Sequence, residues 1–199
     1  AQTQAQADEA AKLVRAEYEE LPVLAGPAMA EGAEHVLNPD FPDNVCCDCY
    51  THKGAAEKGF AASDVIVETD YETQFVEHAY IETETIVAVP SPMRPELTIH
   101  GSIQNPYMVR LSVSRTLNLP LARVLVQPSV LGGTFGGKLE SVEPLAVRAG
   151  LIALKTGRPA RYVLTREESI RESYKRHPIS FRIKIGAAKD GKILAVEGR

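Results

Sequence analysis

The sequence predicts a mixed α/β (α+β) fold, in which mixed sheets pack against helices, and three observations lead to this class. Runs of β-branched and apolar residues predict strands at 65–67, 86–89 and 97–99. Apolar residues at helical spacing predict helices that begin near residues 106 and 142. An Asp190-Gly191 dipeptide between two apolar runs predicts a hairpin. Strand–helix–strand units and hairpins are therefore expected in one chain.

Length and composition are those of a globular protein, with 199 residues, 44% of them hydrophobic and 24% charged. No stretch approaches the roughly 18 consecutive apolar residues that cross a bilayer, and the first residues do not resemble a signal peptide. A net charge of −4 and an aromatic content of 6% disfavour a nucleic-acid surface. We expect a soluble, cytoplasmic enzyme or part of one, with neither nucleic acid nor membrane as partner.

The first third of the chain is predicted to contain one helix and a long connection. Apolar residues recur at helical spacing across 8–21, which predicts an amphipathic helix. Four prolines and two glycines in 22–53 predict an irregular connection. We therefore group residues 1–63 as an N-terminal helix with its connection, and residues 64–199 as the domain segment that carries the chemistry.

Capping residues predict where the later helices begin and end. Asn105 precedes a proline and is a good N-cap for the helix that follows. Gly157 suits the left-handed position after the helix that begins near 142. Thr165 and Glu168 match a capping box, which predicts another short helix.

The second half is also predicted to contain three more strands. Residues 124–126 form an apolar run, which predicts a buried strand. Apolar and polar residues alternate across 179–185, as in a half-buried strand. The Asp190-Gly191 turn leads into a last strand at 193–196.

A glycine-rich turn, LGGTFGGK, lies between a predicted strand and a predicted helix and is the most informative segment. Gly132, Gly133, Gly136 and Gly137 flank two other residues. Glycine allows a positive φ and lets the backbone approach a ligand closely. Successive N–H groups ahead of a helix also bind anions. The turn is therefore the first candidate for a binding site.

Two other interpretations of this turn stay open. Gly132 through Lys138 satisfies most of the phosphate-binding pattern G-x-x-x-x-G-K-[ST], but Leu139 stands where a hydroxyl should bind Mg²⁺. The turn could also serve only to pack a helix against a sheet.

Three cysteines within four residues form a second candidate. Cys46, Cys49 and His52 have the spacing C-x₂-C-x₂-H, which could supply three zinc ligands. The nearby candidates for a fourth ligand are His35, Cys47 and Asp48. A tight, odd-numbered cluster is not a secreted disulfide framework. Buried or half-buried free thiols are the simpler interpretation.

Residues 74–82 mix carboxylate, imidazole and phenol groups. Glu77 and His78 are adjacent, so they would lie on opposite faces of a strand and would not form a local acid–base pair. We expect a solvated strand with one hydrogen-bonded histidine.

Five segments, in this order, resemble the molybdenum hydroxylases: AAKLVRAEYEELPVL, GFAASDVIVETDYETQFVEHAYIETE, SIQNPYMVRLSVSRTLNLP, VLGGTFGGK and LKTGRPARYVLTREESI. The resemblance is to the molybdopterin-binding large subunit of the xanthine dehydrogenase and aldehyde oxidase family, and it covers nearly the whole chain. It implies that this chain is part of such a large-subunit fold.

The resemblance also implies a cofactor and a site. The cofactor would be molybdopterin, as its cytosine dinucleotide, with molybdenum. The cofactor-binding residues would be Gly132, Gly133, Thr134, Phe135 and Gly136, with the backbone of the last two beside the metal's oxo and dithiolene groups. No catalytic residue or metal ligand is assigned. The reaction would be hydroxylation of an N-heterocycle or an aldehyde with oxygen from water.

The expected partners are the rest of the large subunit, an iron–sulfur subunit, an FAD subunit and a small-molecule substrate. No residue matches the family's late catalytic glutamate, so this chain alone should be inactive. It looks like a fragment or the N-terminal piece of a split subunit. The alternatives are a non-catalytic scaffold subunit and a zinc-binding domain.

Two departures from the family argue against a purine substrate. Val76 stands where xanthine dehydrogenases have a glutamine. The nearest amide, Gln74, lies two residues earlier, which is the same face of a strand but not the same location. Leu139 stands where an acidic residue follows the turn, with Glu140 one place later.

Overall fold

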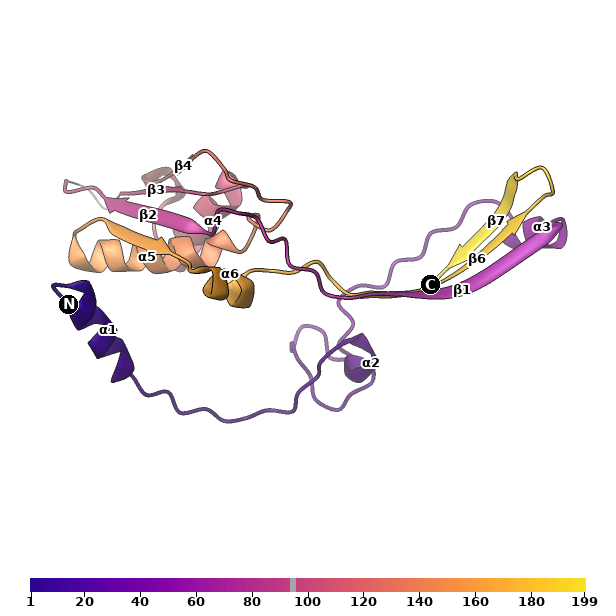
Figure 1. The fold of residues 1–199 in the computed structure, drawn as a ribbon, viewed down its shortest axis with the longest axis horizontal. Coiled ribbons are helices and arrows are strands. Elements are labelled where there is room, and N and C mark those ends of the chain that lie inside the picture. The colour runs from indigo at the N-terminus through magenta and orange to yellow at the C-terminus, as the bar shows by residue number, and fades with distance from the viewer. Residues whose placement is uncertain (94–95) are drawn as a thin grey trace. The chain divides into compact units, whose positions relative to one another are not determined.

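The computed structural model describes residues 1–93 and 96–199. Contacts within the chain divide it into two units, Ala1–Gly54 and Ala55–Arg199. All strands of the described residues belong to the second unit, where they form two sheets (Figure 1). The predicted mixed α/β (α+β) class is confirmed. In the described part of the chain, no helix combines the length and apolarity needed to cross a membrane.

The first unit contains two short helices, α1 (Gln4–Lys12) and α2 (Pro27–Ala30). A capping box between Thr3 and Gln6 begins α1, which ends well before the predicted residue 21. The prediction of a helix over 8–21 is wrong from Leu13 onward, and the apolar residues Leu13, Val14 and Tyr18 are exposed. Within Ala1–Gly54 this stripe is not packed, and a short helix without packing is marginal.

The larger sheet of the second unit has the strand order β4-β3-β2-β5. Its strands are β2 (Thr85–Pro90), β3 (Leu97–Gly101), β4 (Val124–Pro128) and β5 (Ala160–Val163). The helices that follow its strands are α4 (Pro106–Thr116), the 3₁₀ turn η1 (Leu121–Arg123), α5 (Val142–Thr156) and α6 (Arg166–Glu172). Strands β3 and β4 are parallel and are connected through α4, whereas β2 is antiparallel to both of its neighbours.

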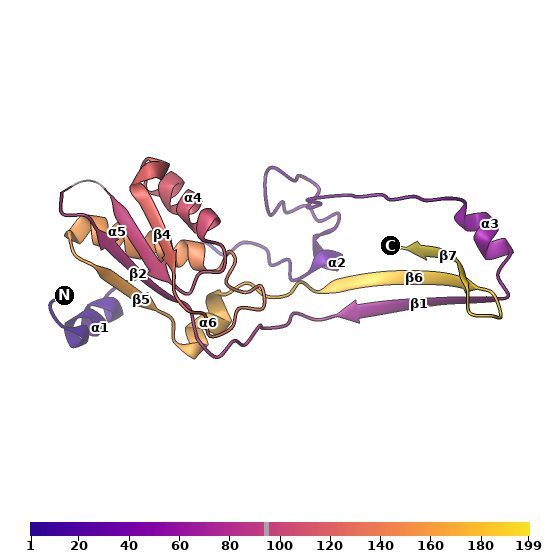
Figure 2. The same cartoon turned by 90° about the horizontal axis from the view of Figure 1, so that it is seen from above.

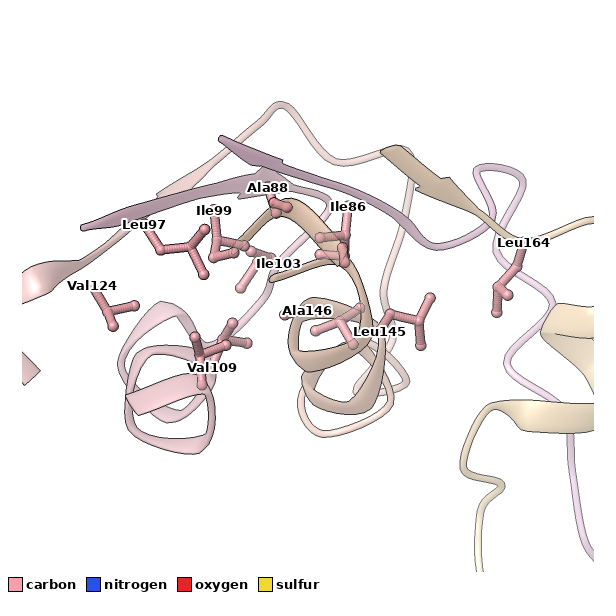
Figure 3. Packing of buried hydrophobic residues seen from close by; sticks show 14 residues of the cluster. Ile86, Ala88, Leu97, Ile99, Ile103, Val109, Val124, Leu145, Ala146 and Leu164 are labelled. Carbon is pink, nitrogen blue, oxygen red and sulfur yellow. The ribbon is translucent and has the colours of Figure 1, made fainter. Parts of the chain in front are cut away.

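The core lies between this sheet and the helices α4 and α5 (Figure 3). Ile86 and Ile99 point from the strands toward Val109 of α4 and Leu145 of α5. The apolar face predicted for α5 is the one that is buried, and Gly157 ends α5 with a left-handed φ of +64°. These local predictions are confirmed because a helical stripe and a glycine cap need no distant partner to be recognised.

Caps and turns predicted elsewhere are also confirmed. The Asn105 side chain accepts a hydrogen bond from the Met108 N–H at 3.3 Å. Thr165 and Glu168 form the capping box of α6. Residues 22–53 contain one short helix, α2, and otherwise turns and irregular backbone, as the prolines and glycines predict.

The smaller sheet is an antiparallel ribbon of β1 (Val65–Thr73), β6 (Ile179–Ala187) and β7 (Ile193–Gly198), in the order β1-β6-β7 (Figure 2). Gly191, with a φ of +87°, forms the predicted hairpin turn. The helix α3 (Ala56–Ala61) packs near this turn, where a Cβ on Gly186 would lie 2.9 Å from the Phe60 ring.

Three strand and helix predictions need correction. Residues 124–126 were predicted to be buried, but Leu125 is 52% exposed because β4 is an edge strand with α4 on one face. Strand β5 and helix α3 were not predicted. Both are short, and their sequences lack a clear period.

Candidate functional site

The glycine-rich turn lies between β4 and α5, and its backbone is left-handed at three positions. The φ angles are +97° at Gly133, +49° at Phe135 and +92° at Gly136. Glycine adopts this conformation readily, whereas it is strained for phenylalanine. The Phe135 side chain is nevertheless 75% exposed, so no packing of the ring explains the strain. Such strain marks functional turns more often than ordinary connections.

The other two glycines allow close packing against residues 78–82. A Cβ on Gly132 would lie 2.6 Å from the Cβ of Glu82. A Cβ on Gly137 would lie 2.7 Å from the Tyr80 ring and 2.8 Å from the His78 ring. The packing interpretation therefore explains Gly132 and Gly137, and a Cβ on Gly133 would also lie 3.2 Å from that of Tyr80. It does not explain Gly136, whose Cβ position is open.

The middle of the turn offers unused hydrogen-bond donors. Within the described residues, no hydrogen bond uses the N–H groups of residues 133–136. The N–H groups on either side are paired: that of Gly132 with the Glu82 carboxylate at 2.7 Å, and that of Gly137 with the Thr134 carbonyl at 2.7 Å. A partly exposed run of four free N–H groups can bind oxygen or sulfur atoms that carry negative charge.

Lys138, the last residue of the turn, is buried and pairs with Glu82. Its side chain has no exposed surface, and its Nζ lies 3.0 Å from Glu82 Oε2 and 4.5 Å from the centre of the Tyr80 ring. A phosphate-binding loop needs a lysine that reaches the ligand. The phosphate-loop interpretation is therefore wrong, because this lysine is committed to a protein carboxylate.

The carboxylate of Glu82 is stabilised in its charged form. Partial burial alone would raise its pKa, but hydrogen bonds from the Gly132 N–H and Lys138, together with the lysine charge, lower the pKa below the usual 4.5. Beside it, the Tyr80 hydroxyl donates to Glu84. Burial, and then the Glu84 carboxylate, raise the pKa of Tyr80. The region beneath the turn is therefore a buried polar network.

Residues 74–82 do not form the solvated strand that was predicted. Val76 makes a single bridge with Arg176, and the left-handed φ of +50° at Ala79 turns the chain beneath the glycine-rich turn. Gln74 contributes its backbone carbonyl to Arg176. The local sequence of residues 74–82 could not predict this backbone path, because the glycine-rich turn against which the segment packs lies about 50 residues later in the chain.

Glu77 and His78 serve separate surroundings. Glu77 pairs with Lys175 at 2.7 Å, whereas the His78 ring packs on Gly137. The predicted absence of an acid–base pair is consistent with this geometry. The predicted hydrogen-bonded histidine is wrong, because the buried His78 Nδ1 has no partner in the described part of the chain. Leu139 and Val76, the two positions that depart from the family pattern, are both 40% exposed. Each is an apolar side chain where the family has a polar one.

The cysteine cluster does not form a metal site. In residues 1–93 and 96–199, no three His, Cys, Asp or Glu side chains are placed to hold an ion, so the alternative zinc site at Cys46, Cys49 and His52 is not assembled. The expectation of buried or half-buried thiols is also wrong, since all three cysteines are exposed. Cys47 and Cys49 lie with their Sγ atoms 3.0 Å apart, and this contact is the first cause that raises the pKa of Cys47.

Sequence reasoning missed Glu82 and Tyr80 and misread Lys138. Glu82 and Lys138 are 56 residues apart, and no sequence motif contains both of them. The one available signal was the lysine directly after the glycines, which suggested a phosphate instead.

Residues 37–199 match the family model described as the molybdopterin cofactor-binding domain. The chain belongs to this family. It is 37% identical over 198 residues to a probable xanthine dehydrogenase component of Bacillus subtilis, a match that covers 98% of the chain and 26% of the relative. The predicted resemblance to xanthine dehydrogenases and aldehyde oxidases is confirmed.

Solved structures agree with this molybdopterin-domain assignment. Aldehyde oxidoreductase from Desulfovibrio desulfuricans superposes with a TM-score of 0.86 at 26% identity, over 98% of this chain and 22% of that one. Quinoline 2-oxidoreductase from Pseudomonas putida superposes with a TM-score of 0.83 at 26% identity, over 100% of this chain and 25% of that one. The chain thus spans about a quarter of the length of each of these three proteins, and it is part of a molybdopterin-binding large subunit.

Proposed function

We propose that the segment 64–199 forms one wall of the cofactor site in a molybdenum hydroxylase. The observation that carries this proposal is the run of four N–H groups at residues 133–136 that have no partner within residues 1–93 and 96–199. Family membership supports molybdopterin as the ligand.

The residues present fit such a group. Gly133, Thr134, Phe135 and Gly136 would donate backbone N–H groups to negatively charged cofactor atoms. Gly136 has open space at its Cβ position, where the nearest atom is His78 Nε2 at 3.9 Å. Gly132 would contribute close backbone approach alone, since its N–H is paired with Glu82.

The cofactor supplies the two-electron oxidation when bound, while this chain binds and orients it. The exposed Phe135 ring would exclude water beside the N–H groups. We propose the cytosine dinucleotide form. No residue of this chain is assigned as acid or base.

The reaction we propose for the whole protein is hydroxylation of an N-heterocycle or an aldehyde with water. Relatives named for quinoline, aldehyde and xanthine support this range. The partners would be the remainder of the large subunit, an iron–sulfur subunit and an FAD subunit, in the cytoplasm. The Bacillus relative, whose name makes it one subunit of a larger enzyme, supports such an assembly.

Two matched glycine variants test the proposal in the full assembled protein. Gly136 has a φ of +92° and Gly191 a φ of +87°, and neither has another atom near enough to clash with a Cβ. Gly136→Val and Gly191→Val therefore impose similar backbone strain. We expect Gly136→Val to lose most of the bound molybdenum and pterin, and Gly191→Val to keep both. Equal metal content in the two variants would refute the assignment. A wild-type protein without molybdenum would favour the alternative function, a non-catalytic scaffold subunit.

A further inference from the structure

We propose that Glu82 is a positioning residue that clamps both ends of the glycine-rich turn and thereby presents the N–H groups of residues 133–136. This inference rests on the proposed function, since it explains how that binding surface is held. We call the contacts of Glu82 with Gly132 and Lys138 the Glu82 clamp.

A single carboxylate oxygen ties together two residues at opposite ends of the turn. Glu82 Oε2 accepts from the Gly132 N–H at 2.7 Å and from Lys138 Nζ at 3.0 Å. The Glu82 N–H donates in return to the Gly132 carbonyl at 3.4 Å. The turn is therefore closed at its base, and the N–H groups of residues 133–136 are left without a partner among the described residues.

The lysine end of the clamp cannot move away from Glu82 without a penalty. Lys138 is completely buried beneath the turn, its ammonium lies over the Tyr80 ring, and its carbonyl accepts from the Gln104 N–H at 3.2 Å. Among the described residues, Glu82 is the one carboxylate that forms an ion pair with it. A buried ammonium without a partner is strongly unfavourable.

The glycine end leaves no room for another arrangement. A Cβ on Gly132 would lie 2.6 Å from that of Glu82, so the two segments pack too closely for any side chain at position 132. Phe135 and Ala79 hold left-handed φ angles on the two contacting segments. Strained backbone persists only where surrounding contacts over-determine it, and the clamp supplies those contacts.

A turn fixed before the ligand arrives binds more tightly, because less conformational freedom is lost on binding. Without the clamp, the four N–H groups would sample several directions. The cofactor would then have to order them, at a cost in affinity.

Hydrogen exchange on the cofactor-free assembled protein tests the clamp without reference to activity. Glu82→Gln keeps the size and one acceptor oxygen but removes the charge. We expect the amides of 132 and 137–139 to exchange about tenfold faster, as expected for loss of a charged hydrogen bond. Bound molybdenum per chain should fall several-fold after cofactor loading.

Two further variants separate positioning from general destabilisation. Glu172→Gln removes the partner of exposed Arg148, a 2.6 Å ion pair elsewhere, and should change neither readout. The double variant Glu82→Gln/Lys138→Met leaves no unpaired buried charge, so we expect it to melt near the wild-type temperature. It should still exchange fast in the turn and retain little molybdenum.

The outcomes distinguish the clamp from the proposed function. Wild-type protection and molybdenum content in the double variant would overturn the clamp while leaving the proposed function intact. A wild-type protein that binds no molybdenum would overturn the proposed function, whereas the exchange measurement would still decide the clamp.

Discussion

Two short segments are rich in reactive or unusual residues: the cysteine-rich loop at 46–52 and the glycine-rich turn at 132–138. The loop gathers thiols and a histidine, yet its side chains are exposed and do not converge on a metal site. The turn contains one ionisable side chain, but a distant carboxylate fixes both of its ends. Long-range contacts, more than local residue type, therefore distinguish a built site from an unusual sequence.

The largest effect is expected where the turn meets the segment beneath it. In Gly137→Val, the new side chain would collide with the rings of Tyr80 and His78 at less than 3 Å. Such overpacking costs about 1–3 kcal/mol of unfolding free energy. Urea unfolding of the assembled protein would measure it, with Gly198→Val as the control, since a Cβ there would lie no closer than 3.8 Å to another atom. An unchanged midpoint in Gly137→Val would mean that this contact is loose.

A smaller effect of opposite sign is expected at Phe135. Phe135→Gly removes the strain of its left-handed backbone, which should raise the unfolding free energy by about 1 kcal/mol after the added flexibility of glycine is subtracted. Cofactor content should fall, because the ring no longer covers the site. Melting and molybdenum analysis of the same sample would check both, and a destabilised variant would contradict the strain.

Acid should loosen the glycine-rich turn. The folded-state pKa of Glu82 is lowered, so its contribution to stability is complete above the ordinary value of 4.5 and is lost as the pH falls below it toward the folded value. Hydrogen exchange of residues 132–139 should therefore accelerate below pH 4.5 in the wild type, relative to the intrinsic rate. Glu82→Gln should lack this acceleration, and an identical profile in both proteins would assign it to another group.

The smallest effect is expected in the loop. Replacing Cys46, Cys47 and Cys49 together by serine should change the unfolding free energy by less than about 0.5 kcal/mol, as for exposed positions generally. Molybdenum content should also stay at the wild-type level. A loss of zinc or of molybdenum in this variant would show that the loop has a role which its geometry does not suggest.

Local signals predicted much of the fold and less of the site. The cap at Asn105, the capping box at Thr165 and the hairpin at Gly191 were all predicted, because each depends on neighbours within a few residues. The helix over 8–21 failed at Leu13, since its apolar stripe needs a partner surface. The glycine-rich turn was singled out, but the role of its lysine was not.

By itself, the sequence determined the α/β class, the buried face of α5 and the family. Periodicity, caps and ordered motifs are properties of the chain before it folds. Only the tertiary structure decided that Lys138 pairs with Glu82 rather than with a phosphate. It also decided that, among the described residues, the cysteines are not gathered with other ligands around an ion. The physical reason is distance along the chain: burial and charge pairing depend on residues that folding alone brings together.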